Sequence, residues 1–246
     1  MKKTLIATTV SALALLASAP GFAQLAGTAT VTNNYVWRGL TQTMNDAAIQ
    51  GGVKYTAENG AYVGTWISNV SFDAGDAYSY EHDLFAGYTG KVDAITYDVG
   101  YLYYNYGKHL GANFGEVYGT VTIDNLSLGA NFLVNEQLQA APGKDFGAFS
   151  SFYLQGNYNI PLNSGAAVAL HVGYHRGDFM EAFNGVTKSY VDYSVGVAKN
   201  GFSFTLGGTN LHSDDDGNGI EDYASMPARN NDQVKFVVAY TTNIEL

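Results

Sequence analysis

QVKFVVAYTTNIEL, residues Gln233 to Leu246, is the stretch of sequence that decides the fold. From Val234 onward every second residue is largely apolar, whereas the positions between them are mixed and more polar. This alternation with a period of two is typical of a β-strand that has one apolar face. The stretch also has about the length of a membrane-crossing strand, which needs roughly nine to eleven residues. It therefore predicts a strand with one face toward lipid.

The same alternation recurs along the chain, whereas helical periodicity is weak throughout. In the N-terminal example, Leu25 and Val31 lie on one face and Thr28 and Thr30 on the other. We expect twelve strands, near residues 25–38, 46–58, 61–72, 79–89, 94–106, 114–124, 126–135, 148–160, 166–177, 188–199, 202–212 and 232–246. An even number is expected of a bacterial membrane barrel, and it places both termini on one side.

The connections between these segments alternate between short and long. The short ones fall at 59–60, 90–93, 125, 161–165 and 200–201, and the long ones at 39–45, 73–78, 107–113, 136–147, 178–187 and 213–231. If the N-terminus lies on the periplasmic side, every short turn is periplasmic and every long loop is extracellular. This sorting is typical of bacterial outer-membrane barrels.

Turn chemistry predicts the register of three hairpins. Asn59-Gly60 suits a two-residue turn with positive φ at both positions, which would place Val53 opposite Trp66. The turns at Asp124-Asn125 and Asn200-Gly201 predict the pairs Ile123–Leu126 and Val197–Phe204. Under these registers the apolar faces of paired strands coincide.

Composition excludes several functional classes. The chain has 246 residues, no Cys, a charged fraction of 14% and a formal net charge of −10. An exported chain without Cys has no disulfide scaffold, thiol chemistry or Cys-based zinc site. A protein this acidic would repel phosphate, so we expect no nucleic-acid partner.

The N-terminus reads as a secretory signal peptide. Lys2 and Lys3 supply a positive start, residues 5–17 form a short apolar stretch, and residues 21–23 resemble a cleavage site. We therefore expect a signal peptide at residues 1–23 and an outer-membrane β-barrel domain at residues 24–246.

Backbone pairing in lipid requires a closed structure, because every N–H and C=O group must find a partner within the protein. The expected fold class is all-β: a single transmembrane antiparallel up-and-down β-barrel of about twelve strands. Aromatic residues at strand ends predict two interfacial girdles. The outer girdle would hold Tyr35, Trp37, Tyr101, Tyr103 and Tyr174, and the inner one Tyr62, Tyr88, Tyr158 and Phe202.

Charged side chains on the inner face predict a narrow, water-filled lumen crossed by ion pairs, since charges inside a membrane barrel must be paired or wet. The expected pore-lining residues are Arg38, Lys54, Glu81, Asp83, Asp98, Glu116, His171, Asp192 and Lys235. Arg38 with Glu81 and Asp83 would form either an ion-selecting constriction or a structural ion-pair network, and the two roles are compatible.

Several blocks resemble the TorF-type porins of Gram-negative bacteria over most of the mature chain. They include YVWRGLTQ at 35–42, AIQGG at 48–52, GAYVGTW at 60–66, DLFAGY at 83–88, YDVGY at 97–101 and YVDYSV at 190–195. The resemblance implies an outer-membrane barrel with a passive-diffusion role. Such barrels usually end in Phe, which the assembly machinery reads, whereas this chain ends in Leu246.

Two motifs suggest other chemistry. Asp214, Asp216 and Asn218 match the first half of a calcium loop in the longest extracellular connection, and the alternative is an acidic, solvated loop tip. His171 and His175 would lie about 13 Å apart on a strand, too far to share one ion. We expect no further cofactor and, without a nucleophile elbow or a nucleotide-binding fingerprint, no enzyme. A lipase using outward-facing His82 is the least favoured alternative.

We therefore expect a bacterial outer-membrane porin for passive diffusion of small solutes or ions, with a mild preference for cations. The alternative is a closed barrel that binds partners through its surface loops. The expected partners are outer-membrane lipids, small solutes or ions, and the barrel-assembly machinery, and the oligomeric state stays open.

Overall fold

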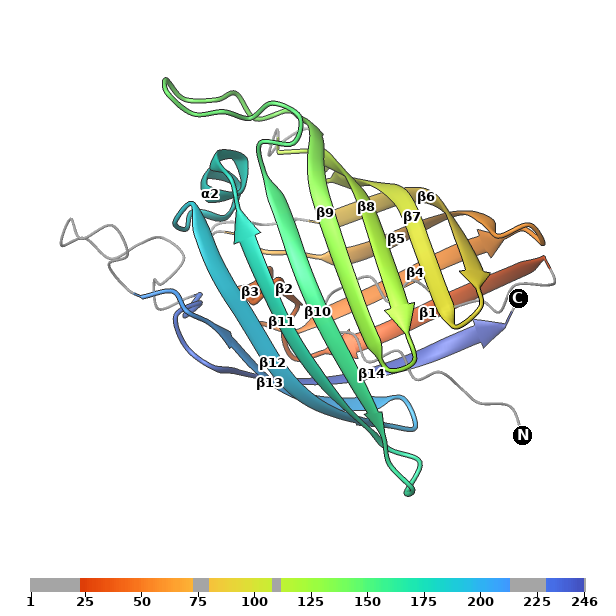
Figure 1. Ribbon diagram of the computed structural model, residues 1–246. Helices are drawn as coiled ribbons and strands as arrows, with labels where there is room; N and C mark the ends of the chain where they lie inside the picture. The colour runs from red at the N-terminus through yellow and green to blue at the C-terminus, as the bar shows by residue number, and fades with distance from the viewer. Residues whose placement is uncertain (1–22, 73–79, 108–111, 213–228, 246) are drawn as a thin grey trace.

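The computed structural model describes residues 23–72, 80–107, 112–212 and 229–245. The predicted signal peptide at 1–23 lies almost wholly outside these residues. The chain forms one closed antiparallel barrel of twelve strands (Figure 1). In chain order the barrel strands are β1 (Gln24–Thr32), β4 (Ala48–Thr56), β5 (Ala61–Asn69), β6 (Tyr80–Val92), β7 (Ile95–Asn105), β8 (Phe114–Ile123), β9 (Leu126–Glu136), β10 (Phe152–Pro161), β11 (Ala167–Arg176), β12 (Ser189–Lys199), β13 (Phe202–Thr209) and β14 (Lys235–Glu245). The predicted fold class and strand number are confirmed.

The barrel closes where β1 pairs with β14, and β1 pairs with β4 on its other side. Thr30 of β1 and Thr241 of β14 lie opposite each other across this seam, and their hydroxyl oxygens are 2.8 Å apart. Closure matters physically because an open sheet would leave a row of unpaired backbone groups in lipid.

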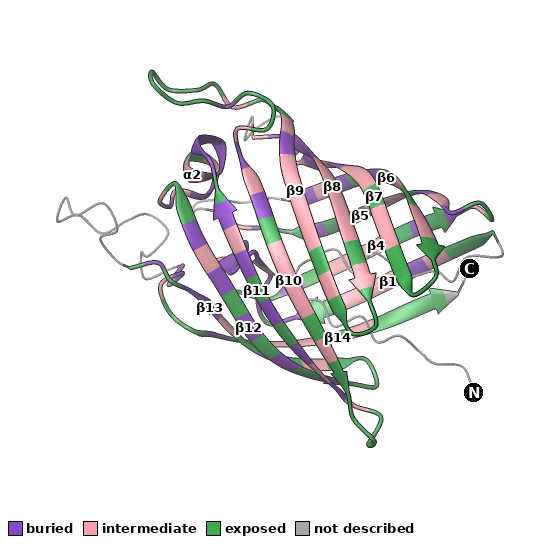
Figure 2. Cartoon of the chain, in the orientation of Figure 1, coloured by how far each residue is buried: buried purple, intermediate pink, exposed green. Residues whose placement is uncertain are grey.

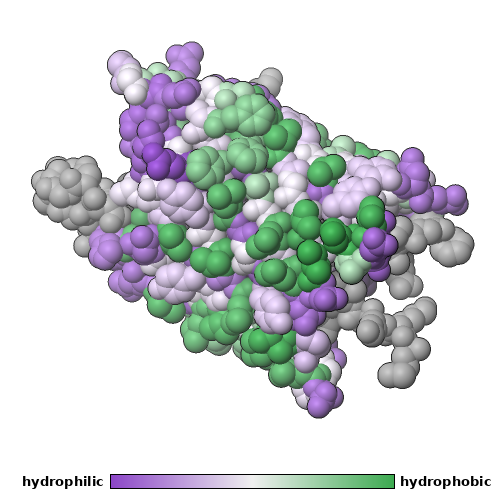
Figure 3. Space-filling view, viewed as in Figure 1, coloured by the Kyte–Doolittle hydropathy of each residue, from purple (hydrophilic) through white to green (hydrophobic). Residues whose placement is uncertain are grey.

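Side chains alternate strictly between the two faces of the wall. In β12, Tyr193, Val195 and Val197 are exposed on the outside, while Asp192 and Ser194 are buried on the inside. Figure 2 shows the same alternation of buried and exposed positions along neighbouring strands. Figure 3 shows apolar side chains spread over the wall and polar ones gathered at its ends. The outer surface is therefore suited to lipid, and the inner one is not.

Two of the three predicted registers are confirmed, and one is wrong by one residue. Ile123 pairs with Leu126 and Val197 with Phe204, as predicted. At Asn59-Gly60 only the glycine has positive φ, at 93°. The turn is a three-residue loop, in which the N–H of Ala57 donates to the carbonyl of Ala61 at 2.8 Å and the N–H of Gly60 donates to the carbonyl of Ala57 at 2.9 Å; such loops commonly end in a left-handed glycine.

The extra loop residue has a large consequence, because a slip of one residue moves a whole strand's side chains to the opposite face. Trp66 therefore pairs with Gly52 and is buried inside, and Tyr62 is also buried rather than part of the inner girdle. Tyr88, Tyr158 and Phe202 are exposed beside the short turns, as predicted.

The described residues contain a short helix, α2 (Asp178–Asn184), between β11 and β12. Two further strands of two residues each, β2 (Val36–Trp37) and β3 (Leu40–Thr41), pair only with each other. Within the described residues, no helix is long and apolar enough to cross a membrane.

Candidate functional site

The chain leaves the barrel wall after β1 and folds into the lumen before it returns as β4. We call this inward segment, residues 33–47, the plug. At its centre β2 and β3 form a hairpin whose two turn residues, Arg38 and Gly39, both have positive φ (48° and 80°). Trp37, Leu40 and Thr41 are all less than 5% exposed. The predicted outer-girdle positions of Tyr35 and Trp37 are therefore wrong, because both residues belong to the plug.

Arg38 reaches across the lumen to the opposite wall. Its guanidinium donates two hydrogen bonds to the carboxylate of Glu116 on β8, at 2.9 and 2.6 Å. It also lies over the rings of Trp37 and Tyr153, 4.2 and 4.4 Å from their centroids. Arg38 and Glu116 are 4% and 0% exposed, so this ion pair is buried. A bidentate pair of this kind is among the stronger polar contacts in proteins.

Other lumen side chains hold the two partners in place. The Glu116 carboxylate also accepts hydrogen bonds from Tyr104 at 3.2 Å and from Asn131 at 3.1 Å. The hydroxyl of Tyr190 donates to the backbone carbonyl of Arg38 at 3.0 Å. A left-handed conformation at a non-glycine residue costs about 1–2 kcal/mol, so these contacts must stabilise the turn against that strain. The sequence predicts a group of Arg38 with Glu81 and Asp83; the acidic partner of Arg38 in the structure is Glu116 instead.

An aromatic cluster fills the outer part of the lumen next to the plug. We call it the aromatic cap; its members are Trp37, Tyr104, Tyr106, Phe114, Phe146, Phe179 and Phe183. The α2 helix supplies Phe179, which is fully buried against the ring of Phe114 at 5.1 Å. Tyr104 stacks on Phe114 at 4.3 Å. This side of the lumen is packed like a protein core.

Surface ion pairs fasten α2 over the cap. Lys188 contacts the Asp178 carboxyl at 2.7 Å, and Lys144 contacts Glu181 at 2.6 Å. The Lys188 ammonium, together with the backbone N–H of Asp145, holds the pKa of the Asp178 carboxyl below its usual value.

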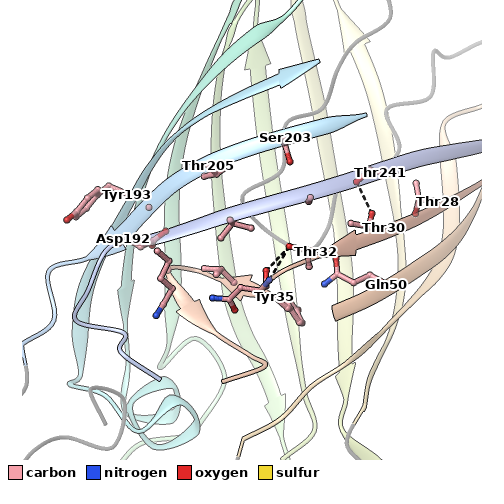
Figure 4. A pocket seen from close by; sticks show the side chains of 18 of the residues that line it. Thr28, Thr30, Thr32, Tyr35, Gln50, Asp192, Tyr193, Ser203, Thr205 and Thr241 are labelled. Atoms are coloured by element: carbon pink, nitrogen blue, oxygen red, sulfur yellow. Dashed lines mark hydrogen bonds between the residues drawn. The ribbon is translucent and has the colours of Figure 1, made fainter. Parts of the chain in front are cut away.

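The opposite side of the lumen contains a cavity of about 110 Å³, which has room for several water molecules. Hydroxyl-bearing side chains of β1, β13 and β14 form part of its lining: Thr28, Thr30, Thr32, Ser203, Thr205 and Thr241 (Figure 4). Val36, Val237 and Ala239 add apolar surface. The lining also includes one residue of the plug, Tyr35, and three residues of the wall, Trp66, Asp192 and Lys235. The plug is thus a shared wall between the cavity and the aromatic cap.

The remaining predicted pore-lining residues are also enclosed by the barrel. His171 bonds Asp192 at 2.8 Å and Asn157 at 2.7 Å, and Lys235 donates to the carbonyl of Arg229 at 2.7 Å. Lower in the lumen, Tyr62 bonds Asp98 and contacts Tyr118, and the Lys54 ammonium lies 4.9 Å from the Tyr62 ring. Glu81 and Asp83 are buried near Tyr35.

The other motifs have less structural support. Asp214, Asp216 and Asn218 lie outside the described residues. Among the residues described, no three His, Asp or Glu side chains form a metal-holding group. His82 lies 2.7 Å from the hydroxyl of Thr65, a neighbour that sequence reasoning missed. That hydroxyl also donates to the carbonyl of Asp83 at 3.0 Å, so its proton is already engaged.

The class of protein follows from these features. A closed barrel with an apolar outer wall and a polar, charged interior is the architecture of an outer-membrane barrel of the porin type. The protein therefore lies in the bacterial outer membrane. A family model described as "Bacterial protein of unknown function (Gcw_chp)" matches residues 17–241, and the chain belongs to this family.

Two solved structures with TM-scores of 0.50 and 0.52 show the same fold at low sequence identity. The KdgM porin is 8% identical with a TM-score of 0.50, and the match covers 91% of this chain and 99% of the porin. A structure described as "Unveiling the Mechanism Behind the in-meso Crystallization of Membrane Proteins" is 9% identical with a TM-score of 0.52, covering 90% and 84%. Outer membrane phospholipase A from Escherichia coli is 9% identical with a TM-score of 0.41, covering 92% and 98%. Curated protein sequences gave no match.

Proposed function

We propose that the protein is a narrow porin-like channel through which small solutes or ions diffuse passively. The observation that carries the proposal is the hydroxyl-lined cavity inside the closed barrel, beside the plug. Threonine and serine hydroxyls replace part of the hydration shell of a passing solute without binding it tightly. The porin-type fold and the resemblance to TorF-type porins support the same function.

The plug sets the narrowest part of this channel. Arg38 and the aromatic cap close the lumen on the side of β8 and α2, so the path runs past the plug along β1, β13 and β14. A path this narrow admits small solutes and excludes large ones.

A mild preference for cations is the finer part of the proposal. The nine predicted pore-lining residues include five acids and three Lys or Arg residues, and the whole chain carries a net charge of −10. An excess of one sign in a low-dielectric passage concentrates ions of the opposite sign.

Conductance across a planar bilayer under a salt gradient tests the channel. We expect a small, steady conductance and a reversal potential that favours cations, with a sharp size limit for neutral solutes. A reversal potential that favours anions would refute the cation preference. Zero conductance from folded protein would refute the channel.

The second candidate function is a closed barrel that binds partners through its outer loops. The observation that favours it is the plugged lumen: the Arg38–Glu116 pair and the aromatic cap leave one side of the interior without space. Binding to a partner that depends on loops 136–147, 178–187 and 213–231, together with zero conductance, would establish this function instead.

A further inference from the structure

The cavity beside the plug has two rows of hydroxyl groups with an apolar strip between them. The rows are Ser203 and Thr205 on β13 and Thr28, Thr30 and Thr32 on β1. Strand β14 runs between them, as Figure 4 shows, and its residues Val237 and Ala239 form the strip. Ala239 pairs with Ser203 on one side and with Thr32 on the other. This wall of the cavity is therefore amphipathic, with polar groups at both edges and an apolar centre.

The two rows lie close enough for one small solute to contact both. Neighbouring strands are about 4.8 Å apart, so the backbones of β13 and β1 are about 10 Å apart across β14. The row side chains reach inward from these backbones, and a hydrogen bond adds about 2.8 Å on each side. A solute that bonds both rows is therefore about as wide as one saturated ring.

Three of the row hydroxyls have no partner in the protein. Those of Thr28, Ser203 and Thr205 make no hydrogen bond with any residue that the structure describes. Thr30 bonds Thr241 of β14, with 2.8 Å between the hydroxyl oxygens, and this pair keeps one proton to donate. Because a hydroxyl both donates and accepts, these groups match a solute whose own polar groups do both.

The charged side chains of the lining are already engaged by the protein. The Lys235 ammonium has three N–H donors; it contacts two backbone carbonyls at 2.7 and 2.8 Å and the side-chain oxygen of Asn45 at 3.1 Å. The Asp192 carboxylate accepts a hydrogen bond from Tyr153 at 3.1 Å and lies 2.8 Å from Nε2 of His171. A charged solute would lose hydration here without meeting a free opposite charge, which is costly.

We propose that this cavity admits neutral polyhydroxylated solutes, the chemistry of a small sugar or sugar alcohol, in preference to charged or zwitterionic solutes of the same size. The C–H face of such a solute packs on Val237 and Ala239, while its hydroxyls bond the two rows. The proposal rests on the channel proposed above, whose preferred solute it names. The cation preference compares ions with one another and is a separate property.

Swelling of proteoliposomes tests the preference with D-xylose and L-glutamine, which have nearly the same mass. Xylose is neutral and rich in hydroxyls, whereas glutamine is a zwitterion at neutral pH. We expect xylose to enter at least about fivefold faster, a difference of about 1 kcal/mol, which is the net contribution of one hydrogen bond. Protein-free liposomes give the background. Equal rates, or faster entry of glutamine, would overturn the preference and leave the channel proposal intact.

A double variant tests the role of the two rows. Thr28→Val/Ser203→Ala removes one unpartnered hydroxyl from each row, so we expect the ratio of the xylose rate to the glutamine rate to fall by at least about threefold. The matched control is Thr120→Val, which removes a hydroxyl of β8 outside the cavity lining and should keep the wild-type ratio. Equal ratios in the double variant and the control would overturn the proposal. The wild-type ratio itself does not depend on any variant folding.

Tryptophan emission decides the case in which neither solute causes swelling. The chain has two tryptophans, of which Trp66 lines the cavity and Trp37 does not. In the full-length barrel folded in detergent, xylose is expected to change the emission saturably and glutamine is not, and Trp66→Phe should remove the change. A response to xylose without swelling would support the sugar site and refute the channel. No response to xylose and no swelling would refute both.

Discussion

The two sides of the lumen differ in how their interior is packed. On the side of β8 and α2, buried aromatic rings and the Arg38–Glu116 pair fill the interior. On the side of β1, β13 and β14, hydroxyl-bearing side chains leave a cavity. The plug contacts both sides, but its strongest contacts are with the filled one. We infer from this difference that the side of β8 and α2 stabilises the barrel, whereas the side of β1, β13 and β14 leaves space inside it.

The largest expected effect comes from Arg38→Ala. This change leaves Glu116 buried without its cation, so we expect a loss of about 3–5 kcal/mol in the free energy of unfolding and a higher conductance. Denaturant unfolding in detergent and bilayer recordings measure the two effects. In the double variant Arg38→Ala/Glu116→Ala much of the stability should return. If conductance stays unchanged in both the single and the double variant, the side of β8 and α2 does not limit the passage of solutes.

A smaller effect is expected from Gly39→Ala. A Cβ atom at this position would lie 2.6 Å from Thr209 and 2.7 Å from Asp192, and φ is +80°. The matched control is Gly143→Ala, where φ is +83° but no atom lies within 4 Å. Backbone strain at positive φ costs about 1–2 kcal/mol in both, so the additional loss in Gly39→Ala measures the docking of the plug against β12 and β13. Equal losses would contradict close docking.

The open side is tested by Thr205→Val, which removes a cavity hydroxyl and nearly keeps the side-chain shape. We expect lower conductance with a change in unfolding free energy below about 1.5 kcal/mol. Thr120→Val removes a hydroxyl from β8, outside the cavity lining, and should leave conductance unchanged. Equal conductance changes in the two variants would place the path elsewhere.

The smallest expected effect is a loss of stability around the α2 helix at low pH. Because the pKa of Asp178 is held below its usual value by Lys188, its contribution to stability is present above the usual carboxyl pKa and is lost as the pH falls through the lowered one. The Lys188 side chain is largely exposed, so the contribution is below about 1 kcal/mol. Proteolysis of the 177–188 loop as a function of pH measures it, and Lys188→Ala should remove most of the acid response.

The wall of the barrel could be predicted from sequence because its signals are local. The side-chain alternation of β12 and the turn at Asn200-Gly201 are both contained in a few consecutive residues, and they predicted the correct register. The Asn59-Gly60 register failed because the same dipeptide suits both a two-residue and a three-residue loop, and only tertiary packing selects between them.

The plug could not be predicted for a related reason. The alternation of Leu25 to Arg38 continues through Trp37, so nothing local marks Thr32 as the last residue in the wall. The alternation predicts that the nine candidate pore-lining side chains face inward, but it does not predict their partners: Arg38 and Glu116 are 78 residues apart in sequence. Thr65, the neighbour of His82, was missed because a lone Thr on a strand carries no signal.

The position of the plug directly after β1 ties it to the closure of the ring. All pairings in the barrel except one join strands that follow each other along the chain, and the exception is β1 with β14. Joining these two strands brings together the ends of the whole domain, so it carries the largest loss of chain entropy. The strand that closes the barrel therefore also carries the plug, and in a barrel open at this seam that strand would be held only by its pairing with β4.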